Sequence, residues 1–145
     1  MQLNIKKLNE NAIIPTRGSE YAAGWDLYAN LEEPLILQPG QLAKISSGIS
    51  IELPENTFGG VFARSGLSTK KGLRPANCVG VVDEDYRGPV IVPLYNDSEN
   101  PAIIEPNERI AQLIVLPYIN CEINEVEELS TTERAESGFG STGTK

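Results

Sequence analysis

The chain of 145 residues contains no histidine and only two cysteines, Cys78 and Cys121. The absence of histidine excludes catalytic triads and dyads built on imidazole, and it excludes the two-histidine metalloprotease site. Both cysteines lie in apolar runs, so we expect two small buried thiols with no histidine available to complete a zinc site. Acid-base chemistry must therefore depend on carboxylates, tyrosine or lysine.

Long apolar runs and basic residues are also scarce. The first ten residues alternate in polarity, so we expect no signal peptide, no membrane contact and a soluble, cytoplasmic protein. Twelve basic against twenty acidic residues give a net charge of −8, which predicts no binding to nucleic acid. Five of the twelve basic residues lie close together, which favours a small phosphorylated ligand bound with a divalent cation: Arg64, Lys70, Lys71, Arg74 and Arg87.

Short strand-like runs separated by proline and glycine turns make up most of the chain, which has ten prolines and thirteen glycines. This pattern predicts one all-β domain of the jelly-roll kind over residues 1–129, with one short helix at residues 65–71 and matching turns at Pro39-Gly40 and Pro106-Asn107. The expected strands are residues 3–8, 35–37, 42–53, 58–63, 79–82, 90–95, 102–104 and 110–118.

Residues 130–145 form a tail rich in serine, threonine and glycine, in which Phe139 is the only large apolar side chain. Alone the tail should be flexible, and many such termini have no role. Its glycines match the G-x-G-x-x-G spacing, but the chain ends where a helix and an acidic partner should follow, so a dinucleotide site is rejected. A glycine-rich arm that closes over a ligand remains possible.

Residues 77–88 join an apolar run to an acidic turn. We interpret Val79, Val81 and Val82 as a buried strand, and residues 89–94 as its partner in a hairpin. The carboxylate of Asp83 at the tip could accept a proton from water. The alternative is a solvated acidic turn without chemistry.

Three further segments have both structural and functional interpretations. Asp26 next to Trp25 is explained by a buried ring and a turn-forming aspartate. Arg64, at a strand end, could face an anion. Arg109 lies on an alternating strand, where a cross-strand polar pair is the stronger interpretation.

Taken in order, five segments resemble the motifs of the trimeric dUTPase family, and the resemblance extends from residue 15 to residue 143. The segments are residues 23–29, 64–67, 77–88, 109–114 and 134–143. The resemblance implies a jelly-roll homotrimer whose three sites each draw on three subunits. It implies Mg²⁺-dependent hydrolysis of dUTP to dUMP and pyrophosphate, which keeps uracil out of DNA and supplies dUMP for thymidylate synthesis.

The resemblance also implies roles for individual residues. Asp83 would orient and deprotonate the water that attacks the α-phosphorus. Gln112 would make a contact near the α-phosphate and this water. Asp26 would reach the metal through bound water. Asp85 competes with Asp83 but does not match the family's base. The substrate contacts implied are Asn77 with Gly80, Val81 and Val82 for uracil, Tyr86 for the deoxyribose, Arg64, Ser65 and Gly66 for the central phosphates, and Arg134, Phe139, Gly140, Ser141 and Thr142 from the arm.

Some residues depart from the family pattern. Ala135 and Ser137 stand where glycines are usual, which reduces the conformational freedom of the arm. Trp25 is larger than the usual residue, and Arg109 is implied to be structural. Two related functions remain open: a dCTP deaminase with the same fold, and a dUTPase-like regulatory protein that binds nucleotide.

Overall fold

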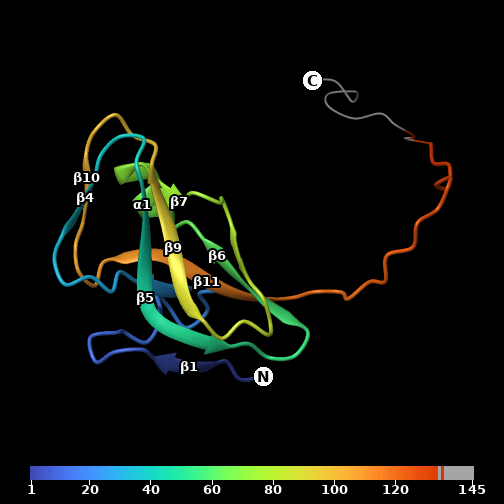
Figure 1. Cartoon of the computed structure of the whole chain (residues 1–145), viewed down its shortest axis with the longest axis horizontal. Coiled ribbons are helices and arrows are strands. Elements are labelled where there is room, and N and C mark those ends of the chain that lie inside the picture. The colour runs from blue at the N-terminus through green and yellow to red at the C-terminus, as the bar shows by residue number, and fades with distance from the viewer. Residues whose placement is uncertain (134, 136–145) are drawn as a thin grey trace.

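The computed structural model describes residues 1–133 and residue 135 (Figure 1). This part of the chain forms eleven strands and one short helix. They are β1 (Asn4–Lys7), β2 (Thr16–Arg17), β3 (Trp25–Tyr28), β4 (Leu35–Leu37), β5 (Leu42–Glu52), β6 (Thr57–Phe62), α1 (Ser65–Lys71), β7 (Leu73–Pro75), β8 (Gly80–Val82), β9 (Pro89–Asn96), β10 (Ala102–Ile104) and β11 (Arg109–Pro117).

Two antiparallel sheets form the body of the molecule. One sheet has the order β1-β5-β9-β7 and the other the order β2-β3-β11-β6-β8, while β4 and β10 form a separate pair. In Figure 1 the strands β5 and β9 lie in front of β6 and β11. The core between the sheets takes side chains from both, among them Ile45, Val92, Leu27 and Leu113. The predicted all-β jelly-roll-like fold is confirmed.

The pairing of the longest strand, β5, is irregular around Gly48. Residues 42–46 pair with β9, the register then shifts before Ser50 pairs with Pro89 of β9, and residues 49–52 pair with β1 on the other edge. Gly48 has a φ of +72°, and a Cβ at this position would lie 2.7 Å from the Cβ of Ala12. Only glycine meets both requirements without strain. Strand β5 thus lies between β1 and β9 and pairs with both.

The two predicted matching turns are confirmed. The N–H of Gln41 donates to the carbonyl of Gln38, and the N–H of Glu108 donates to that of Glu105, at 3.0 and 3.1 Å. The third residue of each turn, Gly40 or Asn107, has a positive φ, as a proline-initiated type II turn requires. Each turn follows one strand of the antiparallel pair β4-β10, so the two turns lie at opposite ends of this pair.

The expected hairpin at residues 79–94 is wrong. Strand β8 pairs with β6 in the five-stranded sheet, whereas β9 pairs with β5 and β7 in the other sheet. The residues between them therefore cross from one sheet to the other. Val79 and Val81 are 38% and 64% exposed, so the predicted buried run is wrong as well. An edge strand with an uncovered face explains this exposure.

The sequence pattern also missed three short strands and misplaced both thiols. Strands β2, β3 and β7 have only two to four residues each, and a charged residue in each one hides the apolar pattern. Cys78 and Cys121 are exposed, which contradicts the prediction of buried thiols. Cys78 lies in the turn before β8 with a φ of +63°, and Cys121 follows the end of β11.

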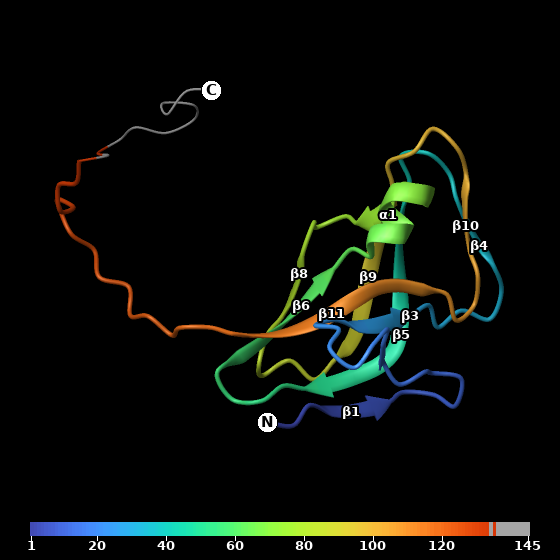
Figure 2. The same ribbon diagram turned by 180° about the vertical axis from the view of Figure 1, so that it is seen from behind.

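Beyond β11 the chain leaves the sheets. Residues 119–133 are exposed and extend away from the body, as Figure 2 shows from behind. The division into a domain of residues 1–129 and an arm of residues 130–145 stays a prediction. No helix in the described part of the chain is long and apolar enough to cross a membrane.

Candidate active site

A polar pocket of about 240 Å³ lies where β3, the end of β6 and β11 meet, and we call it the arginine pocket. The strand order places β11 between β3 and β6, so three segments far apart in sequence contribute to it. Its lining residues are Gly18, Ala22, Gly24, Asp26, Arg64, Ser65, Gly66, Arg109 and Gln112. It therefore unites residues of three predicted motif segments, residues 23–29, 64–67 and 109–114.

Asp26 is the charged centre of this pocket. It lies within β3 rather than in a turn, which corrects the structural interpretation from sequence, and it is only 7% exposed. Its Oδ1 lies 2.7 Å from Nε of Arg64, and its Oδ2 lies 3.4 Å from Nη1 of Arg109. Arg109 thus makes the predicted cross-strand polar pair. Two guanidinium groups neutralise a carboxylate that would otherwise be costly to bury.

Arg64, Ser65 and Gly66 stand at the junction between β6 and α1. Arg64 has an extended backbone, and its carbonyl accepts the N–H of Ser68 at 3.0 Å, which begins the helix. The amides of a first helical turn have no acceptor within their helix. Ser65 and Gly66 are exposed, so their amides and the Ser65 hydroxyl are open to an anion beside Arg64.

Gln112 is held in the same pocket by a contact that the sequence did not reveal. Its Nε2 donates to the carbonyl of Ala63 at 2.9 Å. A Cβ on Gly24 would lie 2.3 Å from Oε1 of Gln112, so this amide occupies the space that the glycine leaves. The Ala-Gly-Trp-Asp segment indicated a turn, and the true function of Gly24 depends on a strand 88 positions away in sequence.

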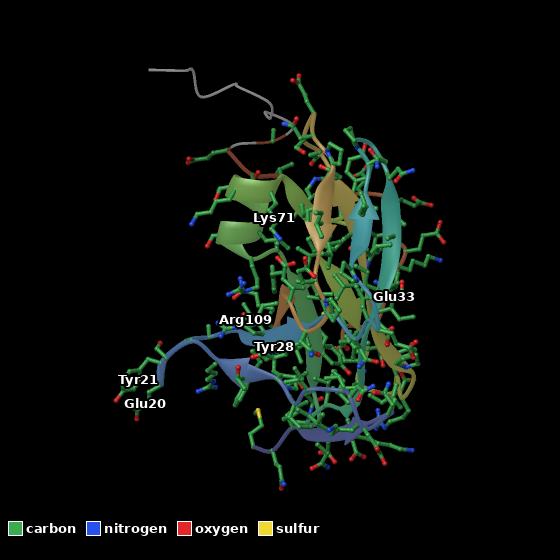
Figure 3. The ribbon with its side chains drawn as sticks, turned by 90° about the vertical axis from the view of Figure 1, so that its left-hand side faces the viewer. Glu20, Tyr21, Tyr28, Glu33, Lys71 and Arg109 are labelled. Atoms are coloured by element: carbon green, nitrogen blue, oxygen red, sulfur yellow. The ribbon has the colours of Figure 1, made fainter. Side chains whose placement is uncertain are left out.

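The loop before β3 projects from the body and carries Glu20 and Tyr21 (Figure 3). Its base is fixed at Trp25, whose ring centroid lies 4.4 Å from the guanidinium carbon of Arg17. The hydroxyls of Thr16 and Tyr28 are 2.6 Å apart across β2 and β3. The large Trp25 is thus half-buried under a cation, an arrangement that the sequence interpretation of a buried ring did not include.

A second group of candidate residues lies along β8, which is an edge strand. Its outer N–H and C=O groups face away from β6 and can pair with a ligand. Asn77 is exposed at the start of this edge. A Cβ on Gly80 would lie 3.3 Å from Nδ2 of Asn77 and 3.2 Å from Cβ of Val61, so Gly80 allows the amide to lie against the strand.

Tyr86 is fixed by its neighbours in the segment after β8. Its hydroxyl donates to the carbonyl of Pro89 at 3.1 Å. A Cβ on Gly88 would lie 2.3 Å from that hydroxyl oxygen, so glycine leaves room for the phenol. The ring is still 42% exposed and can contact a ligand.

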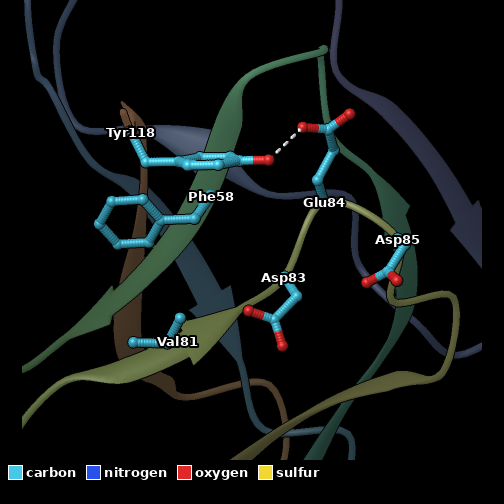
Figure 4. A pocket seen from close by; sticks show the side chains of 6 residues that line it. All are labelled: Phe58, Val81, Asp83, Glu84, Asp85 and Tyr118. Carbon is cyan, nitrogen blue, oxygen red and sulfur yellow. Dashed lines mark hydrogen bonds between the residues drawn. The ribbon is translucent and has the colours of Figure 1, made fainter. Parts of the chain in front are cut away.

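The third group is the acidic turn, residues 83–87. It borders an open pocket of about 590 Å³ that is lined by Phe58, Val81, Asp83, Glu84, Asp85 and Tyr118 (Figure 4). Asp83 is exposed, and the N–H of Tyr86 donates to its carbonyl at 3.1 Å. No group of three or more histidine, cysteine, aspartate or glutamate side chains in the described residues is arranged to hold a metal ion.

The register of the sheet separates Asp83 from the arginine pocket. Val82 pairs with Gly59, whereas Gln112 pairs with Phe62. Asp83 therefore lies level with Phe58, about 13 Å along the strands and about 10 Å across them from Gln112. A general base must approach its proton within about 3 Å. One chain does not bring Asp83 to the residues that surround Asp26.

The arm residues Arg134, Phe139, Gly140, Ser141 and Thr142, together with Ser137, lie outside the described residues. Ala135 is described and has a φ of +45°. This left-handed conformation suits the glycine that the family usually has there and strains an alanine. The departure noted in the sequence therefore coincides with a conformational cost.

The described fold is that of dUTPases in solved structures. A variant of the Staphylococcus bacteriophage 80alpha dUTPase matches with a TM-score of 0.87 at 30% identity, covering 97% of this chain and 98% of that chain. Another variant of that enzyme, solved with dUpNHpp, matches with a TM-score of 0.86 at 29% identity, covering 99% of each chain.

Sequence comparison identifies the family. The dUTPase family model matches residues 10–143. A deoxyuridine 5'-triphosphate nucleotidohydrolase of Hydrogenobaculum sp. is 43% identical over 145 residues, covering 100% of both chains. One from Oryza sativa is 44% identical over 141 residues, covering 97% of this chain and 80% of the rice protein. The chain belongs to the dUTPase family, which confirms the resemblance seen in the five motifs.

Proposed function

We propose that this dUTPase hydrolyses dUTP to dUMP and pyrophosphate through a water that Asp83 orients and deprotonates for attack at the α-phosphorus. A carboxylate suits this role in a chain without histidine. Asp83 faces an open pocket, and its backbone is held in a turn. In the cell this reaction would keep uracil out of DNA and supply dUMP for thymidylate synthesis, and we expect it to occur in the cytoplasm.

The separation of Asp83 from the arginine pocket is the observation that carries the proposal of shared sites. The acidic turn of one subunit would face the arginine pocket of a second, and the arm of a third would close over the ligand. A homotrimer with three such sites follows from cyclic symmetry, because each subunit then contributes every part once. The exposure of Asp83 and Val81 in the single chain supports this arrangement.

Recognition of the nucleoside would depend on the open edge of β8 and on Tyr86. The Asn77 amide has both a donor and an acceptor, and the main chain of Gly80, Val81 and Val82 offers further partners to uracil. The Tyr86 ring, held between Gly88 and Pro89, would lie against the deoxyribose. A ring fixed in this way leaves no room for a 2′-hydroxyl and so excludes UTP.

The triphosphate would bind in the arginine pocket at Arg64, Ser65 and Gly66, with Gln112 near the α-phosphate. Asp26 suits an outer-sphere contact to Mg²⁺ better than direct coordination, because each of its oxygens already faces a guanidinium group. Its remaining lone pairs can accept hydrogen bonds from metal-bound water. When bound, Mg²⁺ would neutralise charge on the phosphates.

Substrate specificity and the role of Asp83 are tested together. Pyrophosphate release is measured from dUTP, dTTP, dCTP and UTP, with Mg²⁺ and with a chelator, for the wild type and Asp83→Asn. We expect turnover of dUTP alone, loss of activity with the chelator, and a fall of at least ~10²-fold in the variant. Equal turnover of UTP would contradict the role of Tyr86, deamination of dCTP would favour the deaminase alternative, and an active Asp83→Asn enzyme would contradict the mechanism.

Subunit mixing tests the shared site directly. Asp83→Asn and Arg64→Ala subunits, each inactive alone, are co-expressed in equal amounts and compared with each parent. If each site combines two chains, about a quarter of the sites in a random mixture receive both intact parts. Recovery of that fraction supports the proposal, and no recovery would show that both parts come from one chain. Truncation after Ser130 should abolish turnover and leave the oligomer intact.

A further inference from the structure

Asp83 needs support that its own strand does not provide. It follows a strand of three residues at a sheet edge, and it is exposed. A displacement of about 1 Å in a catalytic group can lower the rate ~10²-fold. The contacts of the rest of the acidic turn therefore decide how well this carboxylate is placed.

Glu84, the next residue, reaches back to the body of the sheet. Its Oε2 accepts the hydroxyl of Tyr118 at 3.0 Å (Figure 4) and the backbone N–H of Asn56 at 2.7 Å. The N–H of Tyr118 donates to the carbonyl of Asn56 at 3.1 Å. These three hydrogen bonds form a closed ring that joins the acidic turn to the start of β6 and the end of β11. We call Glu84, Asn56 and Tyr118 the Glu84 anchor.

Other contacts of the turn are local or weak. Nη1 of Arg87 donates to the carbonyls of Glu84 and Tyr86 at 2.6 and 3.0 Å, which shapes the turn but does not attach it to a strand. Nη2 of Arg87 lies 3.6 Å from the carboxylate of Glu52, and both side chains are about half exposed. An exposed ion pair of this length contributes little. The Glu84 anchor is thus the stronger attachment.

We infer that Glu84 is a positioning residue for the hydrolytic reaction, because it fixes the acidic turn so that Asp83 meets the attacking water. This inference rests on the role proposed above for Asp83. Two donors on one carboxylate oxygen form charge-assisted hydrogen bonds, which are stronger than neutral ones. The Glu84 carboxylate also raises the pKa of the Tyr118 hydroxyl, so the phenol remains protonated and continues to donate.

Steady-state kinetics of four variants test the anchor. Glu84→Ala removes the acceptor and should lower kcat ~10-fold while KM for dUTP changes less than about threefold, because the turn is displaced but the phosphate contacts are not. Glu84→Gln keeps an oxygen that accepts both donors and should restore most of the rate. Tyr118→Phe removes one donor and should lower kcat about threefold. Glu55→Ala removes an exposed charge next to Asn56 and should leave both constants unchanged.

A double variant separates positioning from an independent effect. If Glu84 acts through Asp83, adding Glu84→Ala to Asp83→Asn should lower the residual rate less than about twofold. A further tenfold loss in that background would overturn the inference, and so would a wild-type kcat for Glu84→Ala and Tyr118→Phe. An active Asp83→Asn enzyme would overturn the mechanism first, and the inference with it. If Glu84→Ala fails to fold, Tyr118→Phe and Glu84→Gln carry the test.

Discussion

Asp26 and Asp83 are both carboxylates of the candidate site, and the fold holds them in opposite ways. Asp26 lies in the middle of β3, is 7% exposed and contacts two guanidinium groups at 2.7 and 3.4 Å. Asp83 lies on an exposed turn beside an edge strand, where its neighbour Glu84 makes the contacts to the sheet. The carboxylate of Asp26 is thus held in ion pairs, and the carboxylate of Asp83 remains accessible to a ligand or to water.

This difference suits the two proposed tasks. A carboxylate shared by two arginines fixes their orientation and so prepares the pocket for phosphate groups. A general base needs lone pairs that are free to receive a proton. Placing the anchor on Glu84 leaves the carboxylate of Asp83 uncommitted, while its backbone stays in place.

Removal of each carboxylate should show the contrast most strongly. Asp26→Asn and Asp83→Asn should both lower kcat by at least ~10²-fold, for loss of phosphate binding in one and of the base in the other. Asp26→Asn should also lower the free energy of unfolding by about 2 kcal/mol, because it breaks ion pairs of a mostly buried carboxylate. The loss is smaller than for a fully buried pair because both arginines are partly exposed. Asp83→Asn should change it by less than ~0.5 kcal/mol.

Denaturant unfolding of both variants measures this difference alongside activity. The wild type and the Asp85→Asn variant, altered at an exposed position of the same turn, are unfolded under the same conditions. An Asp83→Asn protein that loses as much stability as Asp26→Asn would show that the acidic turn is structural after all.

The arginine pocket should also be sensitive to a single methyl group. In Gly24→Ala the new Cβ would lie 2.3 Å from Oε1 of Gln112 and should force this amide away from Ala63. We expect kcat to fall ~10-fold through misplacement of Gln112. Gly18→Ala is the matched control, because nothing lies within 4 Å of a Cβ at that position. Equal effects of the two changes would indicate that pocket volume, and not Gln112, is responsible.

Much of the fold could be predicted from sequence because most strands are apolar or alternating runs bounded by proline, glycine and asparagine turns. The predicted runs near β4, β5, β9, β10 and β11 lie within a residue or two of the observed bounds, as does helix α1. The two proline turns followed from the fixed φ of proline and the left-handed tolerance of glycine and asparagine. Strands β2, β3 and β7 were missed because each is short and contains a charged residue, whereas the equally short β4 and β10 are wholly apolar.

The site was predictable in its residues but not in its connections. Asp26 was expected in a turn because aspartate and glycine favour turns, but pairing with β11 and two arginines overrides that preference. The hairpin at residues 79–94 was expected because the two runs are close in sequence, yet they belong to different sheets. The Glu84 anchor joins positions 28 and 34 residues apart, and no local pattern indicates it.

At the nucleoside side, Gly88→Ala should weaken selection of the sugar. The new Cβ would lie 2.3 Å from the hydroxyl oxygen of Tyr86, so the phenol must move from its contact with Pro89. We expect the ratio of kcat/KM for dUTP to that for UTP to fall about fivefold, because the steric barrier to a 2′-hydroxyl is loosened. Tyr86→Phe keeps the ring in place and should change the ratio less. An unchanged ratio in Gly88→Ala would remove Tyr86 from the specificity mechanism.

The smallest expected effect concerns the pH dependence of the Glu84 anchor. In the folded state the pKa of Tyr118 is raised, first by its hydrogen bond to Glu84 and then by desolvation and the nearby charges of Glu84, Asp85 and Asp83. Stability from a raised pKa is fully present below the unfolded value of about 10 and is lost as pH rises through the folded value. Tyr118→Phe should therefore melt below the wild type at pH 7, and this gap should narrow above about pH 10.

Melting temperatures of both proteins from pH 7 to pH 11 measure the gap, with Tyr21→Phe as a control for loss of a phenol that is 90% exposed. Asp26→Asn, which leaves the Glu84 anchor unchanged, is a second control, and its gap to the wild type should not follow that of Tyr118→Phe. A Tyr118→Phe gap that stays constant to pH 11 would mean that the stability lost in this variant does not depend on the ionisation of the hydroxyl, and so not on its hydrogen bond to Glu84. The acidic turn would then be attached by the Asn56 N–H alone.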